Sequence, residues 1–202
     1  MNLDPEKILS TLRGLGYATF EKEVAYDLNL FGIRTNSITV NEFNDYVGCV
    51  YRDEDMNWQC EIWSATTDPG LYWLQNPSKL DGTAVLVPGQ YRGVYKKDYH
   101  SGKYLALCQR NGPVKVWRDG DKDSKIETGG KIYEGMFGIN IHHASYTGTS
   151  TQVNKWSAGC QVIANIDDFN RMMHLANKQL EHHPTWVKFT YTLITEDDLG
   201  GL

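Results

Sequence analysis

Two stretches carry most of the information in this sequence: Gly138-Ile139-Asn140-Ile141-His142-His143 and, after a polar loop, Trp156-Ser157-Ala158-Gly159-Cys160-Gln161-Val162-Ile163. Each stretch is an apolar strand with a reactive side chain at one end. A thiol attacks carbonyl carbons well only as the thiolate, and because a free cysteine titrates at about 8.5, it needs an adjacent imidazole or a polarising backbone at neutral pH. The pattern therefore predicts Cys160 as a nucleophile and His142 as its general base.

The residues just before the cysteine favour a tight turn. Gly159 lets the backbone approach a substrate closely, and the small side chains of Ser157 and Ala158 permit the turn. Such a turn points amide N–H groups toward a developing oxyanion, so we expect the N–H groups of Gly159 and Cys160 to stabilise it.

These segments resemble the catalytic core of the L,D-transpeptidases, cysteine enzymes that act on peptidoglycan stem peptides. The histidine follows an apolar strand as Ile141-His142, the cysteine lies in the Ser-x-Gly-Cys signature Ser157-Ala158-Gly159-Cys160, and it follows the histidine by 18 residues. The resemblance implies that Cys160 is the nucleophile, that His142 is the base, and that the backbone carbonyl of His143 orients the base. It also implies a β-sandwich-like catalytic domain.

The chain departs from the family pattern at two places beside the nucleophile. The family usually has histidine where this chain has Ala158, and often has Arg or Asn where it has Val162. The first change removes a polar group next to the thiol, and the second removes a substrate contact.

Several residues near the catalytic pair are candidates for a substrate groove. Trp156 either stacks on substrate or packs under the nucleophile loop as an apolar anchor. The polar loop Ser145–Lys155 is long enough to be mobile, and we expect it to border the site because it connects His143 to Trp156. The residues predicted to bind substrate are Trp156, Ser157, Asn140, Tyr146 and Thr67, the last from a Thr/Pro-rich turn at 65–70.

The predicted reaction is acyl transfer from a peptide amide through a thioacyl intermediate, with hydrolysis favoured over cross-linking. Two alternatives stay open. A cysteine protease that acts on proteins usually has an acidic residue between its histidine and cysteine, and residues 143–159 contain none. A catalytically silent wall-binding or virion structural domain is the other, and Ala158 and Val162 favour it.

Composition excludes some partners. The chain has 202 residues and a net charge of −5 without a basic stripe, which disfavours nucleic-acid binding. The spacing of the histidines is not typical of a zinc site, and we expect no metal or cofactor. Cys49, Cys60 and Cys108 look like free thiols, although a bridge between Cys49 and Cys60 across a hairpin stays open.

The first residues, Met1-Asn2-Leu3-Asp4-Pro5-Glu6-Lys7, show no signal-peptide pattern, and no run is long enough to span a bilayer. We therefore expect cytoplasmic synthesis and action on the bacterial cell wall after release or as a virion component, as in a bacteriophage endolysin.

The fold class predicted is mainly β with flanking helices (α+β). Residues 1–35 are expected to form an N-terminal helical cap or accessory segment, with a helix that begins at Asp4-Pro5, and residues 36–202 to form the catalytic domain. Asn165 should cap a second helix, and His182-His183 should lie at its end. Period-two patterns and turn signals predict strands at 46–52, 58–65, 83–95 with a break at 88–89, 105–109, 114–118, 137–142, 160–164 and 186–193, the last with one solvent-exposed face.

Overall fold

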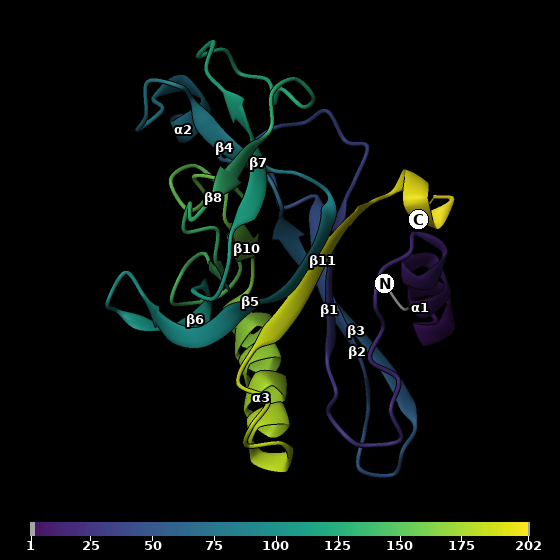
Figure 1. The fold of residues 1–202 in the computed structure, drawn as a ribbon. Coiled ribbons are helices and arrows are strands. Elements are labelled where there is room, and N and C mark those ends of the chain that lie inside the picture. Colours follow the sequence, from purple (N-terminus) through teal and green to yellow (C-terminus); the bar gives the residue numbers. More distant parts are fainter. Residues whose placement is uncertain (1–2, 202) are drawn as a thin grey trace.

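The structure, a computed structural model, describes residues 3–201 and is mainly β with flanking helices, as predicted. Figure 1 shows the helices, which are α1 (Pro5–Gly14), α2 (Leu71–Gln75), α3 (Ile166–His182) and the 3₁₀ helix η1 (Asp197–Leu199). The strands are β1 (Asn29–Arg34), β2 (Asp45–Arg52), β3 (Trp58–Thr66), β4 (Thr83–Leu86), β5 (Gly89–His100), β6 (Tyr104–Gln109), β7 (Val114–Asp119), β8 (Tyr133–Gly135), β9 (Ile141–His143), β10 (Gln161–Ile163) and β11 (Phe189–Thr195).

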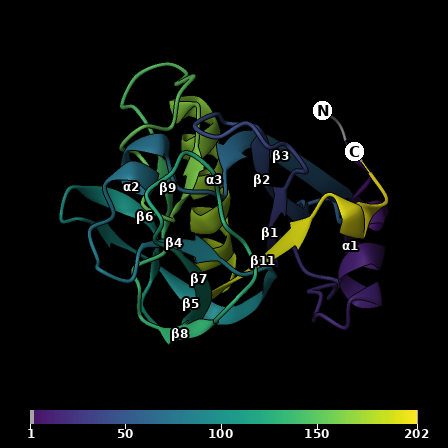
Figure 2. The same cartoon turned by 90° about the horizontal axis from the view of Figure 1, so that it is seen from above.

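Within residues 3–201, eight strands close into a barrel in the order β1-β11-β5-β6-β9-β10-β3-β2 (Figures 1 and 2). Two neighbouring pairs are parallel, β1 with β11 and β9 with β10, and the other pairs are antiparallel. The separate sheet β4-β7-β8 lies at one end of the barrel. The resemblance implied two stacked sheets, whereas the larger sheet closes on itself.

Helix α3 packs its apolar face into the main core. The Asn165 side chain accepts hydrogen bonds from the backbone N–H groups of Asp167 and Asp168, so the predicted cap is present. Phe169, Met172 and Ala176 belong to the same buried cluster as the inward side chains of the barrel strands. The helix ends at His182, as predicted.

Helix α1 begins at Pro5 behind the N-cap Asp4, as predicted, and covers the outer face of the barrel. Its buried Ile8, Leu9 and Leu12 form a second cluster with outward side chains of β1, β2 and β11.

Strand β1 falls within residues 1–35, the segment predicted as an N-terminal cap. It is one of the strands of the barrel, where it pairs with both β11 and β2. Both faces of the strand are buried: Leu30 faces the barrel core while Phe31 and Ile33 face α1, and the strand shows no alternation of polar and apolar residues.

Strand β11 also differs from its prediction. It begins at Phe189, and neither of its faces is open to solvent, because Thr190 and Thr192 are buried. Thr192 accepts a hydrogen bond from the side chain of Gln90 on β5.

The register of β2 and β3 excludes a disulfide between Cys49 and Cys60. Cys49 lies opposite Glu61, while Cys60 lies opposite Val50. Side chains of successive strand residues point to opposite faces, and Cys49 lies in the barrel core while Cys60 packs beside the α1 cluster. All four cysteines are free. Among residues 3–201, no helix has the length and apolar character needed to cross a membrane.

Candidate active site

Strands β9 and β10 are parallel neighbours, and they bring the two predicted catalytic residues, His142 and Cys160, to the same face of the sheet. His142 lies opposite Val162 in the register, and the Gln161 N–H donates to the carbonyl of Asn140. Cys160 lies one position before β10, so the same register places it beside Asn140. Because residues two apart along a strand share a face, Cys160 lies on the face that carries His142. The motif residues are therefore brought together by strand pairing.

Cys160 is half-buried, and its sulfur contacts the backbone of the segment that leads into β9. The Asn140 N–H donates to Sγ at 3.4 Å, and Sγ lies 3.5 Å from the carbonyl oxygen of Gly138. Within the described chain, no hydrogen bond joins Sγ to His142. Hydrogen bonds between a nucleophile and its base are often long without substrate and tighten when substrate binds.

The tautomer of His142 is fixed by its neighbour. Its Nδ1 lies 2.7 Å from the carbonyl oxygen of His143, and because a carbonyl can only accept, Nδ1 carries the proton. The Tyr104 hydroxyl lies 3.4 Å from the same carbonyl and 3.3 Å from Nδ1. Nε2 of His142 therefore keeps its lone pair, which is the form that a general base requires.

Burial keeps both groups uncharged in the resting protein. It raises the pKa of Cys160 to about 11, against the smaller opposing effect of the hydrogen bond from Asn140. Burial, with the neighbouring His100, lowers the pKa of His142 to about 3. At neutral pH the site thus holds a thiol and a neutral imidazole rather than the thiolate that we expected from the sequence.

Comparison of the chain with protein-family models, with curated proteins and with solved structures finds no match.

The turn before Cys160 is tight, as expected, but one of its N–H groups already donates to a side chain of the turn. Ser157 is fully buried; its Oγ donates to the carbonyl of Cys160 at 2.8 Å and accepts from the Gly159 N–H at 3.1 Å. The Gly159 N–H is therefore not free for an oxyanion, contrary to our expectation. In the described part of the chain, the Cys160 N–H has no hydrogen-bond acceptor and stays available.

Residue 159 must be a glycine for steric reasons. Its φ is +113°, and a Cβ there would lie 2.4 Å from the backbone oxygen of Ala84 on β4. The nucleophile turn thus packs directly against the smaller sheet.

Gln109, a residue that the sequence did not single out, organises the segment that holds the thiol. Its buried Oε1 accepts from three successive N–H groups, those of Phe137, Gly138 and Ile139. Its Nε2 donates to the carbonyls of residues 112 and 135. The Gly138 carbonyl and the Asn140 N–H that flank Sγ are placed by this side chain.

Asn140, predicted to contact substrate, is buried and bonds within the protein. Its Oδ1 accepts from the Gln109 N–H at 2.9 Å, and its Nδ2 lies 3.0 Å from Nδ1 of His100. The ring of His100 stacks on that of His142, with centroids 4.2 Å apart and planes 26° from parallel. His100 lies at the end of β5, far away in the sequence, so no motif revealed it.

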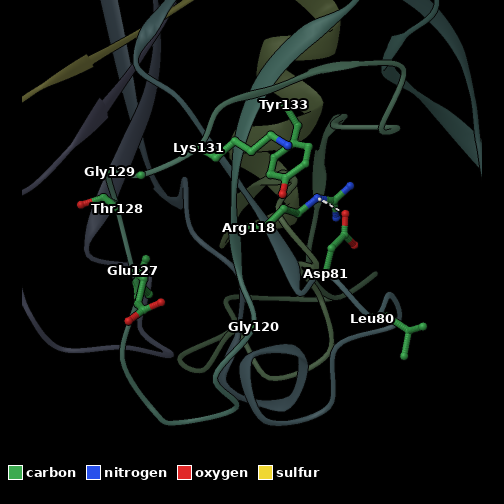
Figure 3. A pocket seen from close by; sticks show the side chains of 11 residues that line it. Leu80, Asp81, Arg118, Gly120, Glu127, Thr128, Gly129, Lys131 and Tyr133 are labelled. Atoms are coloured by element: carbon green, nitrogen blue, oxygen red, sulfur yellow. Dashed lines mark ion pairs between the residues drawn. The ribbon is translucent and has the colours of Figure 1, made fainter.

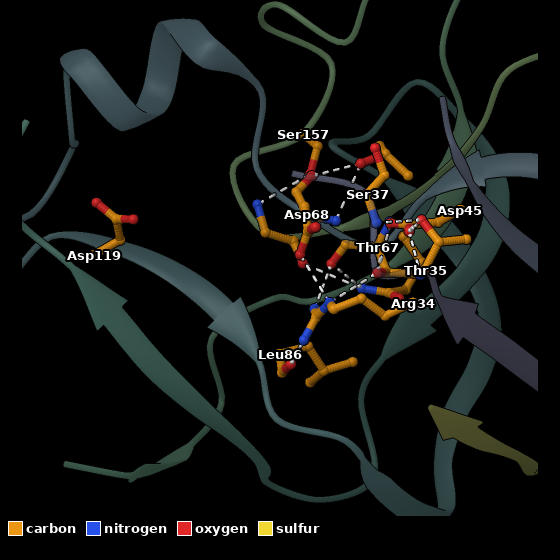
Figure 4. A network of polar contacts seen from close by, with 12 residues as sticks. Arg34, Thr35, Ser37, Asp45, Thr67, Asp68, Leu86, Asp119 and Ser157 are labelled. Atoms are coloured by element: carbon orange, nitrogen blue, oxygen red, sulfur yellow. Dashed lines mark hydrogen bonds and ion pairs between the residues drawn. The ribbon is translucent and has the colours of Figure 1, made fainter. Parts of the chain in front are cut away.

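Thr67 is also buried, in a polar network that closes one end of the barrel (Figure 4). Its Oγ1 donates to Asp45 and accepts from Arg34, whose guanidinium also pairs with Asp68 at 2.9 Å and donates to the Leu86 carbonyl. Thr67 and Ser157, both predicted to bind substrate, are thus buried and bond within the protein.

Gln161 connects this network to the nucleophile. Its Oε1 accepts from the Tyr191 hydroxyl at 2.9 Å, and its Nε2 lies 3.4 Å from the carbonyls of Thr67 and Gly159. The residue after the cysteine is therefore fixed from within the barrel.

Trp156 and Tyr146 remain exposed, as substrate contacts must be. Tyr146 packs edge-on against the rings of His143 and Tyr104. The polar loop between them is held more firmly than we expected, because Val153 is buried and its N–H, like that of Asn154, donates to Asn41.

A cavity of about 690 Å³ lies at the smaller sheet, apart from the catalytic pair (Figure 3). Its lining includes the ion pair of Arg118 and Asp81 together with Glu127, Lys131 and Tyr133. Neither Cys160 nor His142 lines it.

Proposed function

We propose that this protein is a cysteine-dependent acyl-transfer enzyme that acts on peptidoglycan stem peptides. The observation that carries the proposal is the fixed tautomer of His142 beside the half-buried thiol of Cys160. Nucleophilic catalysis by a thiol needs a nearby base with a free lone pair. His142 keeps the lone pair of Nε2, and its strand β9 pairs with β10, which follows Cys160 directly. The choice of stem peptides rests on the motif resemblance.

The reaction begins with two neutral groups. As Sγ attacks the amide carbonyl, its proton passes to Nε2 of His142, and the carbonyl oxygen becomes an oxyanion next to the Cys160 N–H. The C–N bond then breaks, and the amine leaves with the proton from His142. The resulting thioacyl group is released when water or an amine, deprotonated by His142, attacks it and Sγ recovers its proton.

Purified sacculi test this proposal. Digestion with the wild-type protein should release peptides that mass spectrometry detects, and Cys160→Ala should release none. Cys60→Ala, which changes another half-buried thiol that packs beside the α1 cluster, should behave as the wild type. If wild type and Cys160→Ala give the same products on every sacculus type, the protein is not this enzyme.

The same digestion in H₂¹⁸O identifies the acyl acceptor. Hydrolysis, the outcome that we expect from the sequence, places ¹⁸O in a new carboxyl group. Transfer to an amine instead produces a new cross-link without the label.

A further inference from the structure

The proposed oxyanion requires N–H donors beside the thiol. A tetrahedral intermediate is usually stabilised by two donors aimed at its oxygen. Here the Gly159 N–H bonds to Ser157, whereas the Cys160 N–H has no acceptor in the described part of the chain. A side-chain N–H next to the site would supply a second donor.

The proton on the His100 ring can be located from backbone chemistry. The Gln109 N–H can only donate, so the Asn140 atom that it contacts must be the oxygen, and the Asn140 amide nitrogen faces His100. That nitrogen also only donates, so Nδ1 of His100 accepts. The proton of the neutral ring is therefore on Nε2.

The two stacked imidazoles thus present opposite functions. His142 carries its proton on Nδ1 and offers a lone pair at Nε2, whereas His100 carries its proton on Nε2 and offers an N–H. In the described part of the chain, Nε2 of His100 has no hydrogen-bond partner. His100 is half-buried, and it and Cys160 both contact Asn140.

We propose that His100 is a further catalytic residue, whose Nε2–H donates to the oxyanion of the substrate as Cys160 attacks. The inference rests on the proposed acyl-transfer function. Its ring stays neutral because protonation of Nδ1 would break the hydrogen bond from Asn140 and place a charge against His142. Burial, His143, Arg110 and Lys103 lower the pKa of His100 and act in the same direction.

Two amide substitutions separate the donor role from the contact with Asn140. In His100→Asn the side-chain oxygen can take the place of Nδ1 and accept from Asn140, but no donor remains at the position of Nε2. In His100→Gln the amide nitrogen reaches about as far as Nε2 does, while the acceptor near Asn140 is lost. We expect His100→Asn to lower kcat/KM on a stem-peptide substrate about 100-fold, the effect typical of a lost oxyanion donor.

The controls are alkylation of Cys160 and urea unfolding, which do not involve the oxyanion. Both should match the wild type in His100→Asn, and His100→Gln should keep more activity than His100→Asn. A His100→Asn variant as active as the wild type would overturn the proposal, and so would a loss of activity accompanied by slower alkylation or easier unfolding. If the proposed function itself is wrong, wild type and Cys160→Ala will be equally inactive. That result would exclude the donor role of His100 as well.

The ring nitrogens can also be observed directly. Nitrogen-15 NMR distinguishes protonated from unprotonated imidazole nitrogens, and we expect the proton on Nε2 of His100 and on Nδ1 of His142. A proton on Nδ1 of His100 would contradict the assignment without reference to activity.

Discussion

At the scale of single residues, the proposed catalytic pair holds a neutral thiol and a neutral imidazole instead of a thiolate and an imidazolium. His142 is buried and Cys160 is half-buried, and burial disfavours the charged form of each. The consequence is a resting site without an ion pair, in which charge develops only as the reaction proceeds. The chemistry therefore depends on donors that are already in place, such as Tyr104 at the His143 carbonyl.

Alkylation of Cys160 by iodoacetamide measures this state. Because burial raises the pKa of Cys160 to about 11, its thiolate fraction is small at pH 7. The alkylation rate should therefore rise about tenfold for each pH unit between 7 and 10, since thiolate is the reactive form. Peptide mass spectrometry can follow Cys160 separately from the other cysteines.

His142→Gln is the matched variant for this measurement. In a neutral pair the imidazole does not hold a thiolate, so the substitution should change the alkylation rate at pH 7 by less than about threefold. A wild-type rate that levels off below pH 8, and that falls sharply in His142→Gln, would instead reveal a thiolate–imidazolium pair.

His142 and Cys160 could be singled out from the sequence because both lie in short local motifs, and strand pairing places them on one face. Gln109 and His100 could not be found this way, since they reach the site through the pairing of β6 with β9 and through ring stacking. The burial of Thr67 and Ser157 could not be predicted, because a polar side chain next to a cysteine looks the same in sequence whether it faces solvent or the interior.

At the scale of elements, the turn before Cys160 is confined at Gly159 by its neighbour β4. Gly159→Ala should destabilise the protein by about 3 kcal/mol or more, because its φ of +113° strains any side chain and the new Cβ would meet Ala84. Urea unfolding measures the loss, and the shifted turn should also abolish activity.

Gly148→Ala is the control for backbone strain alone. Its φ is +62°, and nothing lies within 4 Å of the added Cβ, so we expect a cost of about 1 kcal/mol and retained activity. Equal costs at the two glycines would show that the turn is not pressed against β4.

Elements with a partly exposed face were predictable. Strand β3 and the cap of α3 follow from a period-two pattern and from Asn165. Strand β1 was missed because both of its faces are buried, and β8 has only three residues, too few for a period to show.

At the scale of the whole molecule, the side chain of Arg34 connects three segments of the chain. It lies on β1 and binds the turn after β3 and the end of β4 (Figure 4). Arg34→Met should lower the free energy of unfolding by about 3 kcal/mol, because it leaves Asp68 buried without its cation.

Arg13→Met tests whether ion pairs in general have this effect. Arg13 also contacts two carboxylates, Glu6 and Glu21, but on the surface, where solvent screens such pairs and they contribute little to stability. Urea unfolding of both variants should therefore separate them. If Arg34→Met costs no more than Arg13→Met, the network does not hold the barrel together.

The parallel pairing of β1 with β11 has a consequence for protein synthesis. A ribosome makes β1 early and β11 only after β10 and α3, so the strand carrying Leu30 must wait for its partner Tyr191. Contacts between such distant segments form slowly because a long loop must be closed first. The nascent chain thus already contains Cys160 while its barrel is still open, and we expect the barrel around the proposed catalytic pair to close only after β11 has been made.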